Sequence, residues 1–469
     1  MELNLKPTVF EVKNQLTIIN PHPLIIKKAK NELEIINPKW SENERMGRWN
    51  GKTSKTLKFY FFDNKKNLVI PRGLSREFIK FCLNNQIEYK ISDKRKEAES
   101  IDFSFSGELK SFQKRAVYDI FSTDFGVLNA PTGSGKTVMA LYLIYLRKQP
   151  SLVIVHTKDL ARQWINQASH FLNIDKKEIG LIGAGKKKEG KKLTIGLVQS
   201  LTKYQGNLKD KIGHLIVDEC HRTPSRTFTD VVSSFPSKYL LGLSATPYRR
   251  DNLSKLIFWY LGNLKHKIEK QNLEIKGYIT EAEIILRPTE FIPFHNPVTE
   301  YSKMMTELTS DDERNRLIAS DIAKAFTKSG GHLIVLSDRK KHCQNLSQIL
   351  KFRHKIDSIV FTGDLSEKER ILLLEKLTSQ ENSIIIATGQ LIGEGFDLKS
   401  LSTLFLTTPV NFSGRLTQYL GRVLRTAPGK TKAVVYDYVD KNVHVLKKSA
   451  ISRASVYGIK SLPDFLNEF

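Results

Sequence analysis

Residues 130–137 read Ala-Pro-Thr-Gly-Ser-Gly-Lys-Thr. The stretch follows the apolar pair Val127-Leu128 and precedes residues 138–146, whose apolar spacing predicts a helix. A glycine-rich turn between a strand and a helix is typical of a phosphate-binding loop, because its backbone N–H groups turn inward and the helix N-terminus adds partial positive charge. This stretch therefore predicts an α/β domain that binds a nucleotide.

Each residue type in the loop has an expected role. Glycines let the main chain approach the phosphates, Lys136 reaches the β and γ phosphates, and the Thr137 hydroxyl is a ligand for Mg²⁺. The first position, often glycine, is Ala130 here, and a glycine-rich turn with a chance lysine is the alternative for this segment alone. The residues expected to hold ATP are Gly133, Ser134, Gly135, Lys136 and Thr137.

Composition limits the class of protein. A chain of 469 residues predicts two to four domains, and 40% apolar residues is ordinary for a soluble globular protein. No apolar run approaches the roughly 20 residues of a membrane span, and the N-terminus lacks a signal peptide's apolar core. Cys82, Cys220 and Cys343 are scattered singly, without a disulfide or zinc pattern, so we expect a cytoplasmic protein and no membrane partner.

The charge balance indicates a polyanionic partner. Lys and Arg outnumber Asp and Glu by 74 to 49, which gives a net charge of +25 spread along the chain. A folded protein this basic attracts nucleic acid, although a lysine-rich bias of an A/T-rich genome is the alternative. The lysine run at residues 186–192 favours a solvated hairpin or loop over a dedicated nucleic-acid contact.

The apolar pattern changes near residue 105. Before it, strands at 56–62 and 67–70, a helix at 75–84 and a charged linker at 93–100 predict a small α+β module. After it, apolar strands alternate with amphipathic helices, which predicts parallel sheets covered on both faces in two α/β domains. The expected strands are 126–128, 152–155, 194–198, 214–217 and 239–242, then, after an irregular stretch at 260–305, 333–336, 358–361, 384–387, 403–406 and 434–438.

Two carboxylates follow the strand at 214–217. Asp218 and Glu219 would lie at the carboxyl edge of a parallel sheet, where such folds bind ligands. Asp218 can hold Mg²⁺ and Glu219 can orient and deprotonate the attacking water. Cys220 and His221 come next, but no further metal ligands cluster with them.

The whole set resembles the superfamily 2 helicases and translocases, which carry two RecA-like domains with ATP held between them. The resemblance covers about 105–440 and implies three parts: an accessory domain at 1–100 that binds DNA, an ATP-binding domain at 101–275 and a helicase C-terminal domain at 276–469. It implies that Gln113 reads adenine, that Ser244 and Thr246 couple hydrolysis to movement, and that His221 belongs to the catalytic set. The residues expected to contact the strand in the first domain are Thr157, Arg162, Gln199 and Ser200.

In the second domain the resemblance implies three groups of residues. Gly395 and Asp397 lie on the ATP side of a segment that links strand and nucleotide. The helical segment at 418–425 holds Gln418 and two candidate arginine fingers, Arg422 and Arg425, one turn apart. The expected strand contacts are Arg339, Thr362, Gly363, Thr388 and Gly389.

Details within the motifs narrow the resemblance to DNA translocases of the XPB, RadD and phage UvsW kind. Asp-Glu-Cys-His replaces the Asp-Glu-Ala-Asp of the commonest RNA helicases, and Ser-Ala-Thr-Pro-Tyr-Arg-Arg-Asp at 244–251 resembles the translocases. The resemblance implies an ATP-dependent DNA helicase that remodels branched DNA in replication, recombination or repair. An RNA helicase and the motor subunit of a restriction or anti-phage system are the alternatives.

The N-terminal part places aromatics among cations, a composition suited to stacking and phosphate contact. Its tryptophans would otherwise belong to a hydrophobic core with charged edges. The residues concerned are Trp40, Arg45, Arg48, Trp49, Lys52 and Lys55.

Overall fold

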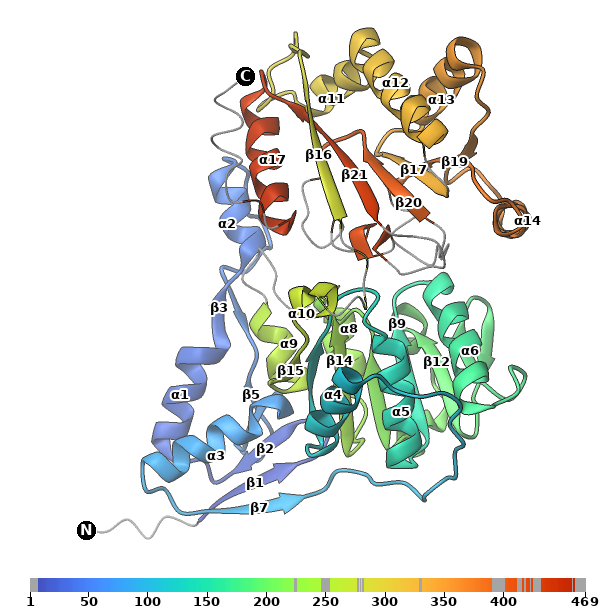
Figure 1. Cartoon of the computed structure of the whole chain (residues 1–469). Helices are drawn as coiled ribbons and strands as arrows, with labels where there is room; N and C mark the ends of the chain where they lie inside the picture. Colours follow the sequence, from blue (N-terminus) through green and yellow to red (C-terminus); the bar gives the residue numbers. More distant parts are fainter. Residues whose placement is uncertain are drawn as a thin grey trace. The chain divides into compact units, whose positions relative to one another are not determined.

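The structure is a computed structural model (Figure 1). It describes residues 7–222, 226–245, 254–275, 278, 280, 282–328, 331–389, 401–410, 416, 419–421, 423–424, 432–457 and 459. The chain divides into two compact units: 1–131 with 135–268, and 132–134 with 269–469. Within the described ranges, none of the helices combines the length and apolar character needed to cross a bilayer.

The N-terminal residues form a small mixed sheet with helices packed on it. In the described part of the chain, its strand order is β5-β6-β2-β1-β7, and a separate ribbon, β3-β4, carries α2 at its end (Figure 1). The elements are β1 (Thr8–Val12), β2 (Leu16–Ile19), α1 (Pro23–Leu33), β3 (Glu34–Ile36), α2 (Pro38–Arg45), β4 (Thr56–Lys58), β5 (Phe61–Phe62), β6 (Leu68–Ile70), α3 (Ser75–Asn84) and β7 (Tyr89–Asp93).

The helix predicted at 75–84 is confirmed, whereas the single strand predicted at 56–62 is wrong. Residues 56–58 pair with β3, residues 61–62 pair with β6, and the chain changes sheet between them. Phe59 lies at the break, where its ring packs edge-on against Trp259 with centroids 5.4 Å apart. This tertiary contact overrides a continuous β pattern.

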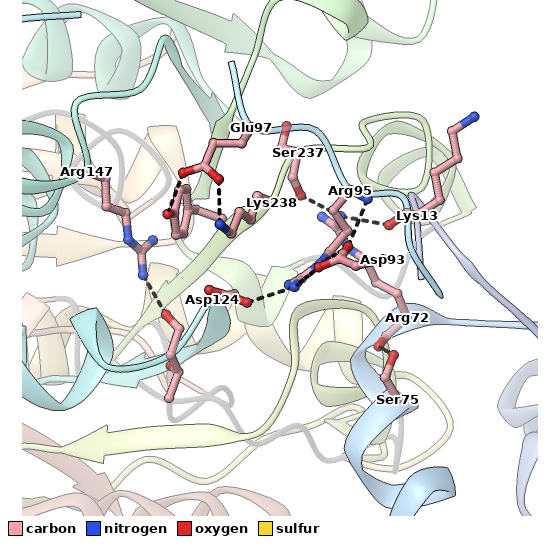
Figure 2. Close-up of polar contacts among 12 residues, drawn as sticks. Lys13, Arg72, Ser75, Asp93, Arg95, Glu97, Asp124, Arg147, Ser237 and Lys238 are labelled. Carbon is pink, nitrogen blue, oxygen red and sulfur yellow. Dashed lines mark hydrogen bonds and ion pairs between the residues drawn. The ribbon is translucent and has the colours of Figure 1, made fainter. Parts of the chain in front are cut away.

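The N-terminal sheet is packed directly onto the predicted ATP-binding domain, as Figure 2 shows for the polar contacts. Its core, which includes Phe10, Ile18 and Phe78, is completed by Leu256 and Trp259. The buried Arg72 donates to the carbonyl of Ser237 (2.8 Å) and to that of Lys13 (3.2 Å). These contacts explain why residues 1–100 and the predicted ATP-binding domain form one compact unit.

Residues just after β7 continue this attachment. Arg95 forms ion pairs with Asp93 (2.6 Å) and Asp124 (2.8 Å). Lys96 forms a parallel bridge with Ser237. The first residues of the segment predicted as a charged linker are therefore held to the rest of the unit by ion pairs and a β-bridge.

The predicted ATP-binding domain is built on a sheet of eight strands in the described residues, ordered β11-β10-β12-β9-β13-β14-β8-β15. Every pairing is parallel except β10 with β11. The elements are α4 (Ser111–Phe121), β8 (Phe125–Asn129), α5 (Lys136–Arg147), β9 (Ser151–Val155), α6 (Lys158–Leu172), β10 (Gly180–Gly183), β11 (Lys186–Lys188), β12 (Leu193–Leu197), α7 (Val198–Leu201), β13 (His214–Val217), α8 (Arg226–Val232), β14 (Tyr239–Ser244), α9 (Ser254–Leu261) and β15 (Leu264–Lys267).

Both faces of this sheet are covered, as the continuous apolar strands predict. The face that carries Leu152 and Ile154 packs against side chains of α7, α8 and α9. The alternate residues, such as Val153, are equally buried on the opposite face. Five predicted strands are confirmed here, and the lysine run forms the exposed strand β11 of a hairpin.

The second unit holds a parallel sheet of six strands in its described residues, ordered β16-β21-β20-β17-β19-β18. Two core clusters fill its two faces: one is built on α12 and α13, and the other includes Leu416, Tyr419, Leu420, Val423 and Leu424. The elements are α10 (Lys270–Ile275), β16 (Ala282–Thr289), α11 (Tyr301–Ser310), α12 (Asp312–Lys328), β17 (His332–Ser337), α13 (Lys340–Ile349), β18 (Ile359–Phe361), α14 (Glu367–Thr378), β19 (Ile384–Thr388), β20 (Leu401–Leu406), β21 (Ala433–Asp440) and α17 (His444–Tyr457).

The stretch predicted as irregular at 260–305 contains two strands, β15 and β16. β16 lies at the edge of its sheet and most of its side chains are only half-buried. It also contains Pro288, and proline in a strand is tolerated at such an edge. An edge strand of this kind lacks the fully apolar run that identified its neighbours.

Candidate nucleotide and nucleic-acid site

The predicted site residues of the first unit gather along one edge of its sheet. Except for Gln113, which lies on α4 ahead of β8, they follow the carboxyl ends of strands that are parallel neighbours. In spatial order the edge carries Gln199 and Ser200 after β12, Thr157 after β9, Asp218 and Glu219 after β13, Ser244 at the end of β14 and the phosphate loop after β8. The carboxyl edge is where open α/β sheets bind ligands.

The phosphate loop has the backbone that its glycines predict. Gly133 and Gly135 have φ of 87° and 84°, a region that side chains rarely adopt. α5 begins at Lys136, directly after the loop, so its N-terminal N–H groups face the loop. The Lys136 Nζ donates to the carbonyl of Ala130 at 3.0 Å, which keeps the ammonium over the loop.

Gln113 lies against this loop from α4. Its side-chain oxygen accepts from the backbone N–H of Lys110 at 2.9 Å, which fixes the amide at the helix N-terminus. A Cβ placed on Gly135 would come within 2.4 Å of Gln113 Nε2, so the amide packs where only glycine fits. The predicted base-reading and phosphate-binding residues are therefore adjacent.

Asp218 is held in one orientation. It is only 6% exposed, and its Oδ1 accepts from the Glu219 N–H at 2.9 Å while its Oδ2 accepts from the Trp164 indole Nε1 at 2.8 Å. Burial and the charge of Glu219 raise the pKa of Asp218 to about 6, against the lowering effects of the Trp164 hydrogen bond and the Lys136 charge. A nearby cation would favour the charged carboxylate.

Glu219 has a strained backbone, with a φ of 49°. A left-handed conformation at a residue other than glycine costs of the order of 1 kcal/mol and is concentrated at functional sites. This conformation belongs to the turn that directly follows β13, where Asp218 and Glu219 both lie at the sheet edge.

His221 connects these carboxylates to the end of β14. Its Nδ1 lies 3.0 Å from Ser244 Oγ and 3.2 Å from Glu219 Oε2, and both His221 and Ser244 are buried. Glu219 and Ser244 are thus joined through one imidazole. This arrangement can transmit a movement at Glu219 to the segment that begins at Ser244.

The donor set fits ATP with Mg²⁺. The Thr137 hydroxyl at the start of α5 and the Asp218 carboxylate are oxygen ligands of the type that Mg²⁺ takes, alongside water and phosphate. Lys136 and the inward-facing backbone supply positive charge for phosphates. The bound metal would neutralise charge on the phosphates during transfer.

The strand-contact candidates of the first unit occupy helix starts. Thr157 is the N-cap of α6 and its hydroxyl accepts from the Leu160 N–H at 3.3 Å. Arg162, one turn further, is partly exposed and lies 3.4 Å from Asp159. Gln199 and Ser200 lie in α7, with Gln199 exposed.

The strand-contact candidates of the second unit also share one sheet edge. Arg339 follows β17, Thr388 ends β19, and Thr362 follows β18, and these strands are neighbours. Gly363 has open space around it, since a Cβ there would meet nothing within 4 Å. Gly389, by contrast, lies under Tyr419, whose hydroxyl donates to its carbonyl at 2.8 Å.

Several predicted residues lie outside the described ranges. They are Thr246, Gly395, Asp397, Gln418, Arg422 and Arg425. Their roles stay predictions.

The sequence reasoning missed two groups of residues. Trp164, the buried partner of Asp218, lies within a segment recognised only for strand contact. Asn315 and His342 form a buried chain with Ser337, beside the Arg339 loop. The only sequence signal for Trp164 is its place on the apolar stripe of an amphipathic helix. A tryptophan at such a place is far more often a hydrophobic core residue than a hydrogen-bond partner of a functional carboxylate.

Comparison with known families agrees with this geometry. Residues 106–249 match the family described as the res subunit of type III restriction enzymes. Residues 304–427 match the helicase conserved C-terminal domain.

Three relatives are viral or archaeal. The chain is 27% identical over 465 residues to a putative ATP-dependent RNA helicase of Acanthamoeba polyphaga mimivirus, covering 96% of this chain and 81% of that one. It is 24% identical over 438 residues to the ATP-dependent DNA helicase uvsW of Enterobacteria phage T4, covering 87% and 84%. It is 25% identical over 350 residues to the DNA 3'-5' translocase XPB2 of Sulfurisphaera tokodaii, covering 68% and 79%.

Among solved structures, that of T4 UvsW covers 97% of both chains at 19% identity, with a TM-score of 0.43. The family assignment rests on the two domain families and the relatives, which confirm the resemblance in the motifs. The chain is an ATP-hydrolysing helicase of superfamily 2, of the XPB/UvsW type, with two RecA-like domains in tandem.

Proposed function

We propose that this helicase moves on DNA and remodels branched DNA, such as stalled forks and four-way junctions. The observation that carries the proposal is the single sheet edge on which the predicted nucleotide-binding residues and the predicted nucleic-acid contacts of the first unit are neighbours. ATP hydrolysis and nucleic-acid binding would therefore occur at the edge of the same sheet. The names of the T4 and XPB relatives support DNA, as does the net charge of +25.

We infer the roles of the described catalytic residues from their positions, and those of Arg422 and Arg425 from the resemblance of their sequence segment to the family. Thr137 and Asp218 would hold Mg²⁺, Glu219 would orient and deprotonate the attacking water, and His221 would pass the change at Glu219 to Ser244. Arg422 and Arg425 would stabilise charge on the γ-phosphate as arginine fingers, a role typically worth about 10³–10⁵ in turnover.

We infer that residues 1–100 are an accessory DNA-binding domain. Trp49 is 92% exposed, and the Lys55 ammonium lies 5.1 Å from the centre of the Trp40 ring, so neither aromatic belongs to the buried core of this part. Exposed aromatics beside cations suit stacking and phosphate contact. Because this part shares a core with the ATP-binding domain, a strand bound to it would move with that domain.

The three cysteines support a cytoplasmic setting. Cys82, Cys220 and Cys343, all of them within the described residues, form no disulfide and are buried. Burial raises the pKa of Cys82 and of Cys343 to about 11, so neither is poised for redox chemistry.

The test is steady-state ATPase at fixed salt without nucleic acid and with single-stranded DNA, duplex DNA, a fork, a four-way junction or RNA. Lys136→Ala is the blank, because it removes the ammonium over the phosphate loop. We expect the fork or junction to stimulate most, with stimulation falling steeply with salt because backbone contact releases counterions.

Stimulation by RNA alone would refute the DNA assignment and favour the second candidate, an RNA helicase. The mimivirus relative, named a putative RNA helicase, is the observation behind that candidate. Equal stimulation by every DNA form would refute the preference for branched DNA while keeping the DNA motor.

A further inference from the structure

The indole of Trp164 connects two parts of the site that the mechanism treats separately. Trp164 is 1% exposed, and its Nε1 donates to Oδ2 of Asp218 at 2.8 Å. A buried tryptophan needs an acceptor for its N–H, but a backbone carbonyl serves that need as well as a carboxylate. Here the acceptor is the carboxylate expected to hold the metal.

The geometry fixes Asp218 without using up its oxygens. Oδ1 accepts from the Glu219 N–H and Oδ2 accepts from Trp164. A carboxylate has about four lone-pair positions, so two remain to face a cation and its water. One donor comes from the next residue in the chain and the other from α6, and together they fix both oxygens of the carboxylate.

Trp164 is also part of the helix that begins at the strand-contact segment. α6 starts directly after Thr157, and its buried residues Ala161, Trp164 and Ala168 form one stripe against the sheet. Thr157 caps the first turn of α6 by accepting from the Leu160 N–H, and Trp164 lies on the second turn of the same helix. A helix with intact hydrogen bonds shifts as a unit, so a strand that moves Thr157 also moves the indole.

We propose that Trp164 is a positioning residue that orients Asp218 and relays strand binding at the start of α6 to the metal carboxylate. The proposal rests on the proposed function only for the roles of Thr157 and Asp218. The hydrogen bond from Trp164 to Asp218 is then the link by which a bound nucleic-acid strand changes the affinity for the metal ion.

The test uses Trp164→Phe in the full chain, because phenylalanine keeps an aromatic ring in the core and removes the indole donor, and a matched tryptophan variant accounts for the smaller ring. Trp259→Phe is the matched control: it is the other buried tryptophan of the same unit, and it packs in the N-terminal core, which contains neither Asp218 nor α6. The first readout is Mn²⁺ affinity in the presence of a non-hydrolysable ATP analogue, followed by electron paramagnetic resonance, with and without forked DNA.

We expect Trp164→Phe to weaken Mn²⁺ binding by about 10–100-fold, the usual effect of removing a partner that orients a metal ligand. We also expect forked DNA to change Mn²⁺ affinity in the wild type and in Trp259→Phe, by a factor typically of about 5–150, and to have no effect in Trp164→Phe. Affinity for DNA without nucleotide should stay the same in all three proteins.

Unchanged Mn²⁺ affinity in Trp164→Phe would overturn the orienting role, and DNA that shifts Mn²⁺ affinity equally in Trp164→Phe and the wild type would overturn the relay. An equal loss in Trp259→Phe would show a general packing effect and also overturn it. If no nucleic acid stimulates the wild-type ATPase, the proposed function fails, whereas the Mn²⁺ affinity without DNA still decides the orienting role.

Discussion

Acid should destabilise the second unit through one buried histidine, His342. Its Nε2 lies 2.8 Å from Asn315 Oδ1 and its Nδ1 lies 2.9 Å from Ser337 Oγ. Because the Asn315 oxygen can only accept, Nε2 carries the proton and Nδ1 accepts from the serine hydroxyl. The neutral ring is fully satisfied, and a second proton would introduce a buried charge.

Burial and the nearby Arg314 guanidinium lower the pKa of His342 to about 3, from an unfolded value of 6.5. Since the folded pKa is depressed, the stability is intact above pH 6.5 and is lost progressively as the pH falls toward 3. Each pH unit in that window costs about 1.4 kcal/mol. Between pH 7 and pH 5, His342 should therefore remove about 2 kcal/mol.

The perturbation that isolates this effect is His342→Gln. The glutamine amide can donate to Asn315 but cannot titrate, so the variant keeps the bond and loses the acid sensitivity. The assay is hydrogen exchange of amides in β17 and α13 of the full chain, which gives the free energy of opening of that region at each pH. His444→Gln, at an exposed position, is the matched control.

We expect the opening free energies of the wild type and His342→Gln to diverge by about 2 kcal/mol from pH 7 to pH 5, with His444→Gln following the wild type. Parallel profiles for wild type and His342→Gln would refute the reasoning. Ser337 also bonds the backbone N–H of Arg339 at 3.1 Å, so loss of this chain should loosen the predicted strand contact as well.

Three further changes have definite expected outcomes. Glu219→Gln should bind ATP but lower turnover by about 10²–10⁴, because it removes the proposed general base and keeps the side-chain shape. A nucleotide-binding assay and the steady-state ATPase rate measure these two effects, and normal turnover would contradict the role of Glu219 as the base. Gly73→Ala should destabilise the first unit by about 1–3 kcal/mol, because the added Cβ would lie 2.4 Å from the carbonyl oxygens of Phe258 and Trp259. Thermal melting measures the loss, with Gly363→Ala as the control because a Cβ there meets nothing within 4 Å, and equal melting temperatures for the two variants would contradict the prediction. Arg453→Met should lower the free energy of unfolding, measured in urea, by about 3–5 kcal/mol, because it removes the ion-pair partner that lies 2.8 Å from the buried Asp437 carboxylate. Adding Asp437→Asn should recover part of this loss, and no recovery would show that an uncompensated charge is not the cause.

The sequence alone determined the chemistry that is local in the chain. The phosphate loop, Lys136 and the Asp218-Glu219 pair are each encoded within a few consecutive residues, and the central strands are apolar throughout because both their faces are buried. Strand alternation then predicted the parallel sheets. It failed where neighbours outweigh local pattern, at the break by Phe59 and at the half-buried edge strand β16.

Only the tertiary structure decided which distant residues meet. The contacts of Trp164 with Asp218, His221 with Ser244, and Arg314 with Asp440 join residues 54, 23 and 126 positions apart. Each of these contacts depends on the order of the strands in a sheet and on which side of a helix faces that sheet. A local sequence pattern specifies neither the strand order nor the orientation of the helix. Burial then gives these few hydrogen bonds their importance, because a polar group removed from water must find its partner within the protein.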